Sequence, residues 1–125
     1  MSTKTHVKNW KENIRELLKN TIRHPYNNYL EEFVNFLEKL CETWQKCPQE
    51  IKEKYAYHLA LLQADSNKLN VIRAKINAYY AYLVFKGYTT VYRLIRNKFV
   101  AGGESIYTWL RLYRDIAKYS NSHTQ

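Results

Sequence analysis

Four groups of basic residues recur at helical spacing along the chain, and two of the groups also contain tyrosines. Their residue types and spacing indicate binding of phosphate groups and bases. The groups are Lys4, Lys8, Lys11, Arg15 and Lys19; Lys68, Lys75, Tyr79, Tyr82 and Lys86; Arg93 and Arg96; and Tyr107, Arg111, Arg114 and Lys118. Lysine and arginine neutralise phosphates and release counterions, while tyrosine rings stack on unpaired bases. With Arg73, the last three groups are the predicted nucleic-acid-binding residues.

The distribution of charge supports this interpretation. Residues 66–125 hold ten basic and two acidic residues, a net charge of +8, whereas residues 1–65 hold ten basic and nine acidic residues, a net charge of +1. Such an asymmetry indicates one side that faces a polyanion and another that is free for other contacts. Two alternatives remain open, namely ordinary solvated helix faces and an anionic membrane surface, although no segment pairs a basic face with a wide exposed Leu/Phe face.

Helices must position these residues, because apolar residues recur at intervals of three and four along most of the chain. We expect an all-α fold, a compact bundle of five to six helices. The expected helices cover residues 5–22, 26–45, 49–64, 67–86, 89–99 and 104–119. Pro25, Pro48 and Gly87 mark boundaries between them. We expect one helical domain over residues 1–119 and a polar C-terminal tail over residues 120–125.

The second expected helix is acidic and carries Glu31, Glu32, Glu38 and Glu42. Carboxylates repel phosphate, so we expect this helix to face away from nucleic acid. If the chain belongs to a larger assembly, the glutamates are expected to meet a neighbouring subunit.

No group of residues predicts catalysis or a bound metal. Cys41, Cys47 and His58 match no zinc spacing and lack a fourth ligand, and no glycine-rich loop leads into Lys-Ser or Lys-Thr. We therefore expect a chain that is not an enzyme and needs no cofactor or metal. The longest apolar stretch, residues 76–85, is too short for a membrane span, and residues 1–10 lack a signal-peptide pattern, so we expect a cytoplasmic protein without membrane partners.

Three segments follow one another over about residues 27–119: the helix that begins with residues 27–30 (Asn-Asn-Tyr-Leu), residues 72–80 (Ile-Arg-Ala-Lys-Ile-Asn-Ala-Tyr-Tyr) and the aromatic-rich residues 105–119. In this order they resemble the small helical subunit of type III CRISPR effector complexes and, more broadly, the small-subunit group shared with type I complexes. The resemblance implies a non-catalytic bundle, present in several copies, that lines a ribonucleoprotein filament and holds guide and target strands. The chain departs from that family at residues 81–83, where Ala-Tyr-Leu replaces small residues, and it lacks the family's usual closing histidine.

A second, local resemblance covers residues 95–114, which look like a helix-turn-helix of transposase or regulator type. There the second helix would read the major groove. Arg96 and Val100 depart from this pattern, because the crossing point favours a small residue and the turn favours glycine.

We expect the chain to bind the backbone of RNA or single-stranded DNA. We expect it to do so as a subunit of a ribonucleoprotein assembly that includes other subunits and copies of itself. The alternatives are a DNA-binding regulator and a viral nucleoprotein or scaffold whose basic face packages a genome.

Overall fold

Helices joined by short turns make up the part of the chain that the structure, a computed structural model, describes, which is residues 10–122. Its elements are α2 (Trp10–Thr21), the 3-10 helix η1 (Tyr26–Tyr29), α3 (Leu30–Gln45), α4 (Gln49–Gln63), α5 (Leu69–Phe85), α6 (Val91–Arg96) and α7 (Glu104–Ser122). No strand occurs within residues 10–122. The predicted all-α bundle of five to six helices is confirmed.

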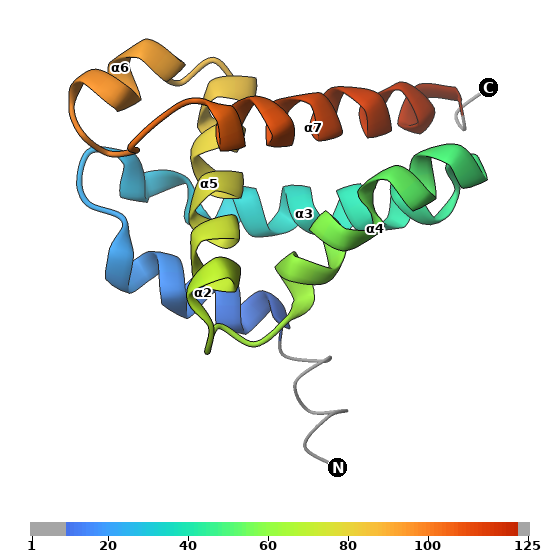
Figure 1. Cartoon of the computed structure of the whole chain (residues 1–125), viewed down its shortest axis with the longest axis horizontal. Coiled ribbons are helices and arrows are strands. Elements are labelled where there is room, and N and C mark those ends of the chain that lie inside the picture. The colour runs from blue at the N-terminus through green and yellow to red at the C-terminus, as the bar shows by residue number, and fades with distance from the viewer. Residues whose placement is uncertain (1–9, 123–125) are drawn as a thin grey trace.

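Helix α5 is the central element of the bundle. In Figure 1 it crosses the directions of α3 and α7, and it packs most extensively against α7. Its sequence is apolar on nearly every side, which is typical of a helix covered all round. Three alanines, Ala74, Ala78 and Ala81, are buried along it and let neighbouring helices approach closely.

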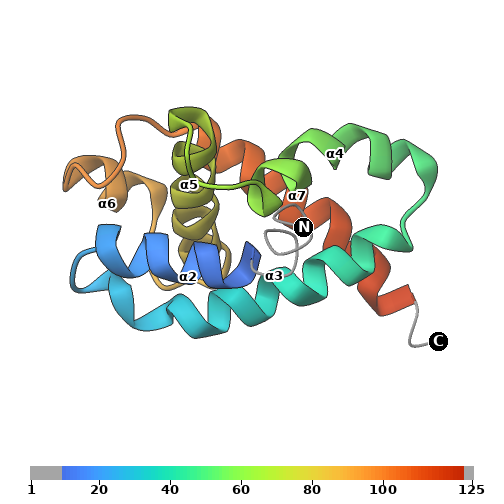
Figure 2. The same cartoon turned by 90° about the horizontal axis from the view of Figure 1, so that it is seen from below.

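Helices α2 and α3 form a second layer beneath α5. The turn at residues 22–29 reverses the chain, so that α2 lies alongside α3 (Figure 2). Ile14 and Leu18 of α2 and Phe33 and Leu37 of α3 are fully buried, and they follow the spacing of three or four that places residues on one helix face.

Two residues with positive φ follow helices α5 and α6 of the basic second half. Gly87, at φ +81°, follows α5, and the backbone N–H of Tyr88 donates to the Leu83 carbonyl at 2.8 Å. Lys98, at φ +63°, follows α6, and the N–H of Phe99 donates to the Leu94 carbonyl at 2.9 Å. Lysine is not a usual stop signal, which explains why the prediction carried this helix to residue 99.

Other predicted boundaries shift slightly. Residues 26–29 form a 3-10 turn rather than the first turn of an α-helix, and α6 begins at Val91 behind the Thr90 cap, whose hydroxyl accepts from the Arg93 N–H at 3.1 Å. Helix α7 continues to Ser122, past the boundary expected at residue 119. The predicted helical residues 5–9 and the last three residues of the predicted tail lie outside the described residues.

Candidate nucleic-acid interface

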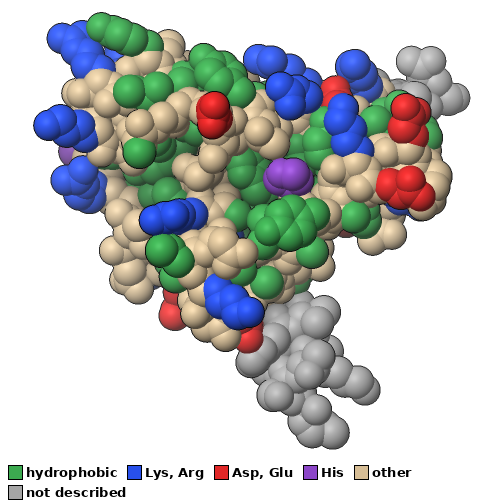
Figure 3. All heavy atoms as spheres, viewed as in Figure 1, with side chains coloured by type: hydrophobic (Ala, Val, Ile, Leu, Met, Phe, Trp, Pro, Cys, Tyr) green, Lys and Arg blue, Asp and Glu red, His purple; other side chains and the backbone are tan. Residues whose placement is uncertain are grey.

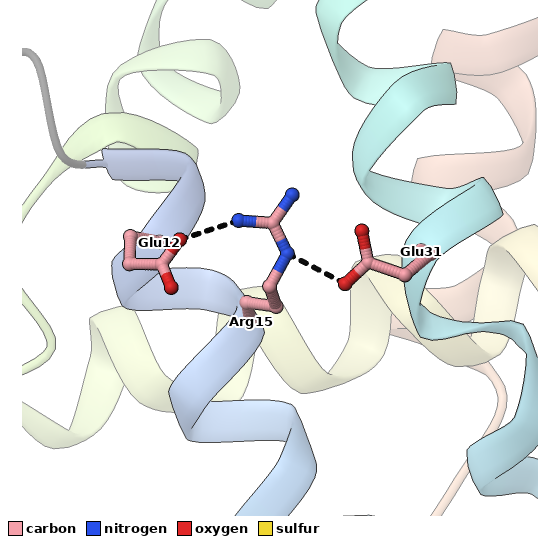
Figure 4. Close-up of polar contacts among 3 residues, drawn as sticks. All are labelled: Glu12, Arg15 and Glu31. Atoms are coloured by element: carbon pink, nitrogen blue, oxygen red, sulfur yellow. Dashed lines mark hydrogen bonds and ion pairs between the residues drawn. The ribbon is translucent and has the colours of Figure 1, made fainter.

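Of the three described cations of the first basic group, Lys11, Arg15 and Lys19, two form ion pairs within the chain. The guanidinium of Arg15 donates to Glu12 at 2.5 Å and to Glu31 of α3 at 2.6 Å (Figure 4). Lys11 pairs with Glu38 of α3 at 3.0 Å. Lys4 and Lys8 lie outside the described residues, and Lys19 is exposed. The stripe therefore joins α2 to α3, and it is a weaker candidate for phosphate binding than its spacing suggests.

The acidic side chains of α3 have partners within the same chain. Besides Glu31 and Glu38, Glu32 accepts hydrogen bonds from the hydroxyls of Tyr88 at 2.6 Å and Tyr82 at 2.7 Å. These bonds lower the pKa of Glu32, the one from Tyr88 most strongly. Glu42 is exposed. Three of the four glutamates that were expected to meet another subunit therefore also have partners within the chain, and their contact with another subunit stays a prediction.

The prediction that Lys75, Tyr79 and Tyr82 form an exposed stripe on α5 is wrong. Their side chains are buried, with exposed fractions of 0, 0 and 2%. The hydroxyl of Tyr79 donates to the Tyr26 carbonyl, and the hydroxyl of Tyr82 donates to Glu32. The spacing placed them on a ridge distinct from the apolar one, but a central helix has no solvent-facing ridge along this stretch. These residues cannot meet nucleic acid in this fold.

Lys75 is instead a buried connection among three segments. Its Nζ donates to Asn13 Oδ1 of α2 at 2.7 Å, to Ser66 Oγ at 2.8 Å and to the Ala64 carbonyl. Burial lowers its pKa to about 8, and the charge of Asp65 opposes that shift. Lys68 and Lys86, at the two ends of the predicted stripe, are exposed, as is Arg73.

The predicted ridge on α7 lies at the surface. Tyr107, Arg111, Arg114 and Lys118 are all exposed, and Tyr107 shows 54% of its side chain to solvent. Lys118 lies 3.9 Å from Asp115, whose carboxylate also accepts a hydrogen bond from Tyr55 at 2.5 Å. Because α7 buries its opposite face on α5 and α3, this ridge remains available to a ligand.

Arg93 and Arg96 of α6 are also exposed, and the structure adds neighbours that the sequence did not single out. A hollow of about 570 Å³ between α6 and the turn before η1 is lined by Arg23, His24, Arg93, Asn97 and Phe99, among others. The guanidinium of Arg23 lies 5.3 Å from the centre of the Phe99 ring. Arg23 and His24 are 69 to 70 residues before Arg93 in the chain, so spacing could not relate them.

A second hollow, of about 540 Å³, lies where α5 meets the loop between α6 and α7. Arg73, Asn77, Phe99 and Ser105 line it, together with one carboxylate, that of Glu104. Figure 3 shows Lys and Arg side chains gathered at the end of this face formed by α6 and the turn before η1. Acidic side chains on the same face lie at the opposite end, near the turn from α3 to α4, and also at the lower end of the molecule, with one nearer the middle.

The helix-turn-helix predicted for residues 95–114 is not matched by the geometry. Residues 97–103 connect α6 to α7, whereas that motif uses a turn of about three or four residues. The first half of α7 also supplies Ile106, Trp109, Leu110 and Tyr113 to the core.

The cysteines and His58 belong to separate environments. The Cys47 thiol donates to the Thr43 carbonyl at 3.4 Å, while His58 packs edge-on against Trp109, with ring centres 5.4 Å apart. Within residues 10–122, no three His, Cys, Asp or Glu side chains gather as a metal site would require. In the same range, no helix has the length and apolar character of a membrane span. Compared with models of protein families, with curated proteins and with solved structures, the chain gives no significant match.

Proposed function

We propose that this chain binds the sugar-phosphate backbone of RNA or single-stranded DNA and contributes binding rather than catalysis. One observation carries the proposal. Nine of the ten basic residues of the second half have exposed side chains, the exception being Lys75. Among the described residues, the ion pairs of these nine are limited to the long one between Lys118 and Asp115.

This arrangement differs from that of the first half of the chain. There, Lys11 forms an ion pair with Glu38 of α3, and Arg15 forms ion pairs with Glu12 of α2 and Glu31 of α3. In the second half, Arg73, Arg93, Arg96, Arg111 and Arg114 are exposed without such partners among residues 10–122. Like charges held together on one folded chain repel each other, and a polyanion relieves that repulsion while releasing its own counterions.

We further propose that the chain works as a subunit of a ribonucleoprotein assembly. This part of the proposal is supported by the resemblance of residues 27–30, 72–80 and 105–119 to the small subunit of CRISPR effector complexes. Purification of the tagged chain from its native host tests it. Recovery of a CRISPR backbone protein with guide RNA would support the assembly, and recovery of the chain alone with genomic duplex would favour a regulator.

The binding itself is tested by charge reversal on the α7 ridge. Arg111→Glu with Arg114→Glu should weaken binding of a fluorescent single strand by at least about tenfold in anisotropy titrations, since two exposed cations that attract the strand become anions that repel it. Both side chains are exposed, so each change should alter the free energy of unfolding by about 0.5 kcal/mol or less.

The matched control is Lys39→Glu with Lys46→Glu, which makes the same change in net charge on the acidic side of the molecule. Both lysines are exposed and belong to α3 or its C-terminal cap. The affinity of the control for the single strand should stay within about threefold of that of the unmodified chain, because salt screens charges that lie far from the binding surface. If both double variants weakened binding equally, the loss would reflect the net charge of the protein alone. That result would contradict a binding surface at the α7 ridge.

A further inference from the structure

Three hollows of the molecule are joined through shared lining residues. Phe99 lines both the hollow that contains Arg73 and the hollow that contains Arg23 and His24. Arg93 and Asn97 line the latter and also a smaller hollow of about 320 Å³, where Tyr92 and Arg96 lie. The three hollows therefore form one series, from the α5–α7 crossing, past the turn before η1, to the outer side of α6.

Each hollow of the series contains at least one arginine that can bind a phosphate group. Arg73 lies in the first hollow, Arg23 and Arg93 in the second, and Arg93 with Arg96 in the third. Aromatic rings accompany them. Phe99 is shared by the first two hollows, and Tyr92, 71% exposed, is in the third. Alternating cations and aromatic rings are what an unpaired strand requires, because its backbone needs charge and its bases need stacking surfaces.

We infer that an unpaired nucleic-acid strand follows these hollows, with its phosphates at Arg73, at Arg23 with Arg93, and at Arg96, and with a base stacked on Tyr92. This inference rests on the proposed function and gives it a path and a class of substrate. A duplex is stiff over about 150 base pairs, so it cannot follow a series of hollows around a small protein. A single strand bends at each nucleotide and can enter all three.

The path includes residues that the basic stripes did not indicate. Arg23 and His24 come from the turn before η1, and they reach the same hollow as Arg93 because that turn lies beside α6 (Figure 1). The α7 ridge of Arg111, Arg114 and Lys118 lines none of the three hollows. It can add general attraction for a polyanion, but it lies off the path.

The experiment compares two double variants of equal charge, Arg23→Gln with Arg93→Gln on the path and Arg111→Gln with Arg114→Gln on the ridge. The probe is a fluorescent oligouridine of about a dozen nucleotides, long enough for one binding site of this size, and a duplex of the same length is the second probe. We expect the path variant to lose at least about tenfold in affinity for oligouridine and the ridge variant to lose less. Far-UV circular dichroism and urea unfolding identify any variant that fails to fold.

Two single variants keep the test decisive even if a double variant is unstable. Tyr92→Leu removes a ring that is 71% exposed and should weaken oligouridine binding by about fivefold or more, with little effect on the duplex. Glu104→Gln removes the carboxylate that lines the hollow of Arg73, and it should tighten oligouridine binding about two- to fivefold at low salt. A gain of affinity with an unchanged far-UV circular dichroism spectrum cannot come from loss of the folded binding surface.

The outcomes separate the path from the proposed function. If the ridge variant binds oligouridine more weakly while the path variants and Glu104→Gln bind it as tightly as the unmodified chain, the proposed path is contradicted. Binding of the nucleic-acid backbone would still be supported. If duplex binds as tightly as oligouridine or more tightly, the path is also wrong. If the unmodified chain binds neither probe, the proposed function itself fails.

Discussion

The buried Lys75 provides a prediction that depends only on the fold. Its side chain is fully buried, and its Nζ donates to Asn13, Ser66 and the Ala64 carbonyl. Replacing it by methionine, Lys75→Met, keeps a long unbranched side chain and removes the titrating amine. The substitution leaves the Ala64 carbonyl and Asn13 Oδ1 with one donor fewer, at a cost that does not vary with pH.

The magnitude follows from the pKa of Lys75, which falls from 10.5 to about 8 on folding. Between these values the unfolded chain holds a proton that the folded chain has released, so the contribution of Lys75 to the free energy of unfolding rises with pH. The full cost, present below pH 8, is about 3 kcal/mol, from 2.5 pKa units at about 1.36 kcal/mol each. From about pH 7.5 to about pH 9.5, roughly 2 kcal/mol of that cost should disappear.

Urea unfolding of both chains at these two pH values, followed by far-UV circular dichroism, measures the effect. Burial raises the pKa of Tyr79, Tyr82 and Tyr113, which destabilises the fold above about pH 10. Both chains contain these tyrosines, so their effect cancels in the difference. The unmodified chain should gain about 2 kcal/mol relative to Lys75→Met as the pH rises. A difference that stays constant with pH would refute the assignment of Lys75 as a buried, proton-releasing amine.

Three further predictions concern specificity and packing. Selection from random duplexes should enrich no sharp motif, because backbone contacts carry no base information; an enriched palindrome would instead favour a regulator. Tyr113→Phe should lower the free energy of unfolding by about 1 kcal/mol, because its buried hydroxyl donates to the Ala78 carbonyl at 2.5 Å, whereas the exposed Tyr107→Phe should change it little. Arg15→Met should cost up to about 1 kcal/mol, and the cost should shrink in high salt; a salt-independent loss would assign it to packing rather than to the pairs with Glu12 and Glu31.

Helical periodicity was sufficient to predict the class of fold and the approximate position of each helix. It worked for α7, where the apolar Ile106, Leu110 and Tyr113 are buried and Tyr107, Arg111 and Arg114 are exposed. Such a helix has one face on the core and one in water, so the spacing of its apolar residues indicates which face is buried and which is exposed.

The same reasoning failed for α5. Along residues 74–83, α5 is covered on most sides, so polar residues are buried there as well, and hydrogen bonds to neighbouring segments satisfy them, as for Lys75, Tyr79 and Tyr82. Which segments lie near each other is a property of the tertiary fold, so the pairing of Lys11 with Glu38 was not predictable from spacing. For the same reason, the sequence could not predict that Arg23 and Arg93 line the same hollow.

The central claim is that the exposed cations of the second half hold phosphates, and the salt dependence of binding tests it most directly. The dissociation constant of oligouridine should be measured by anisotropy over a series of salt concentrations. If at least three of these cations each hold one phosphate, the logarithm of the association constant should fall with the logarithm of salt at a slope of about −2 or steeper, since each contact on a single strand contributes about −0.7. Arg93→Gln should reduce the steepness by about 0.7, and Lys39→Gln should leave it unchanged. A slope near zero, or an equal change for both variants, would contradict the claim.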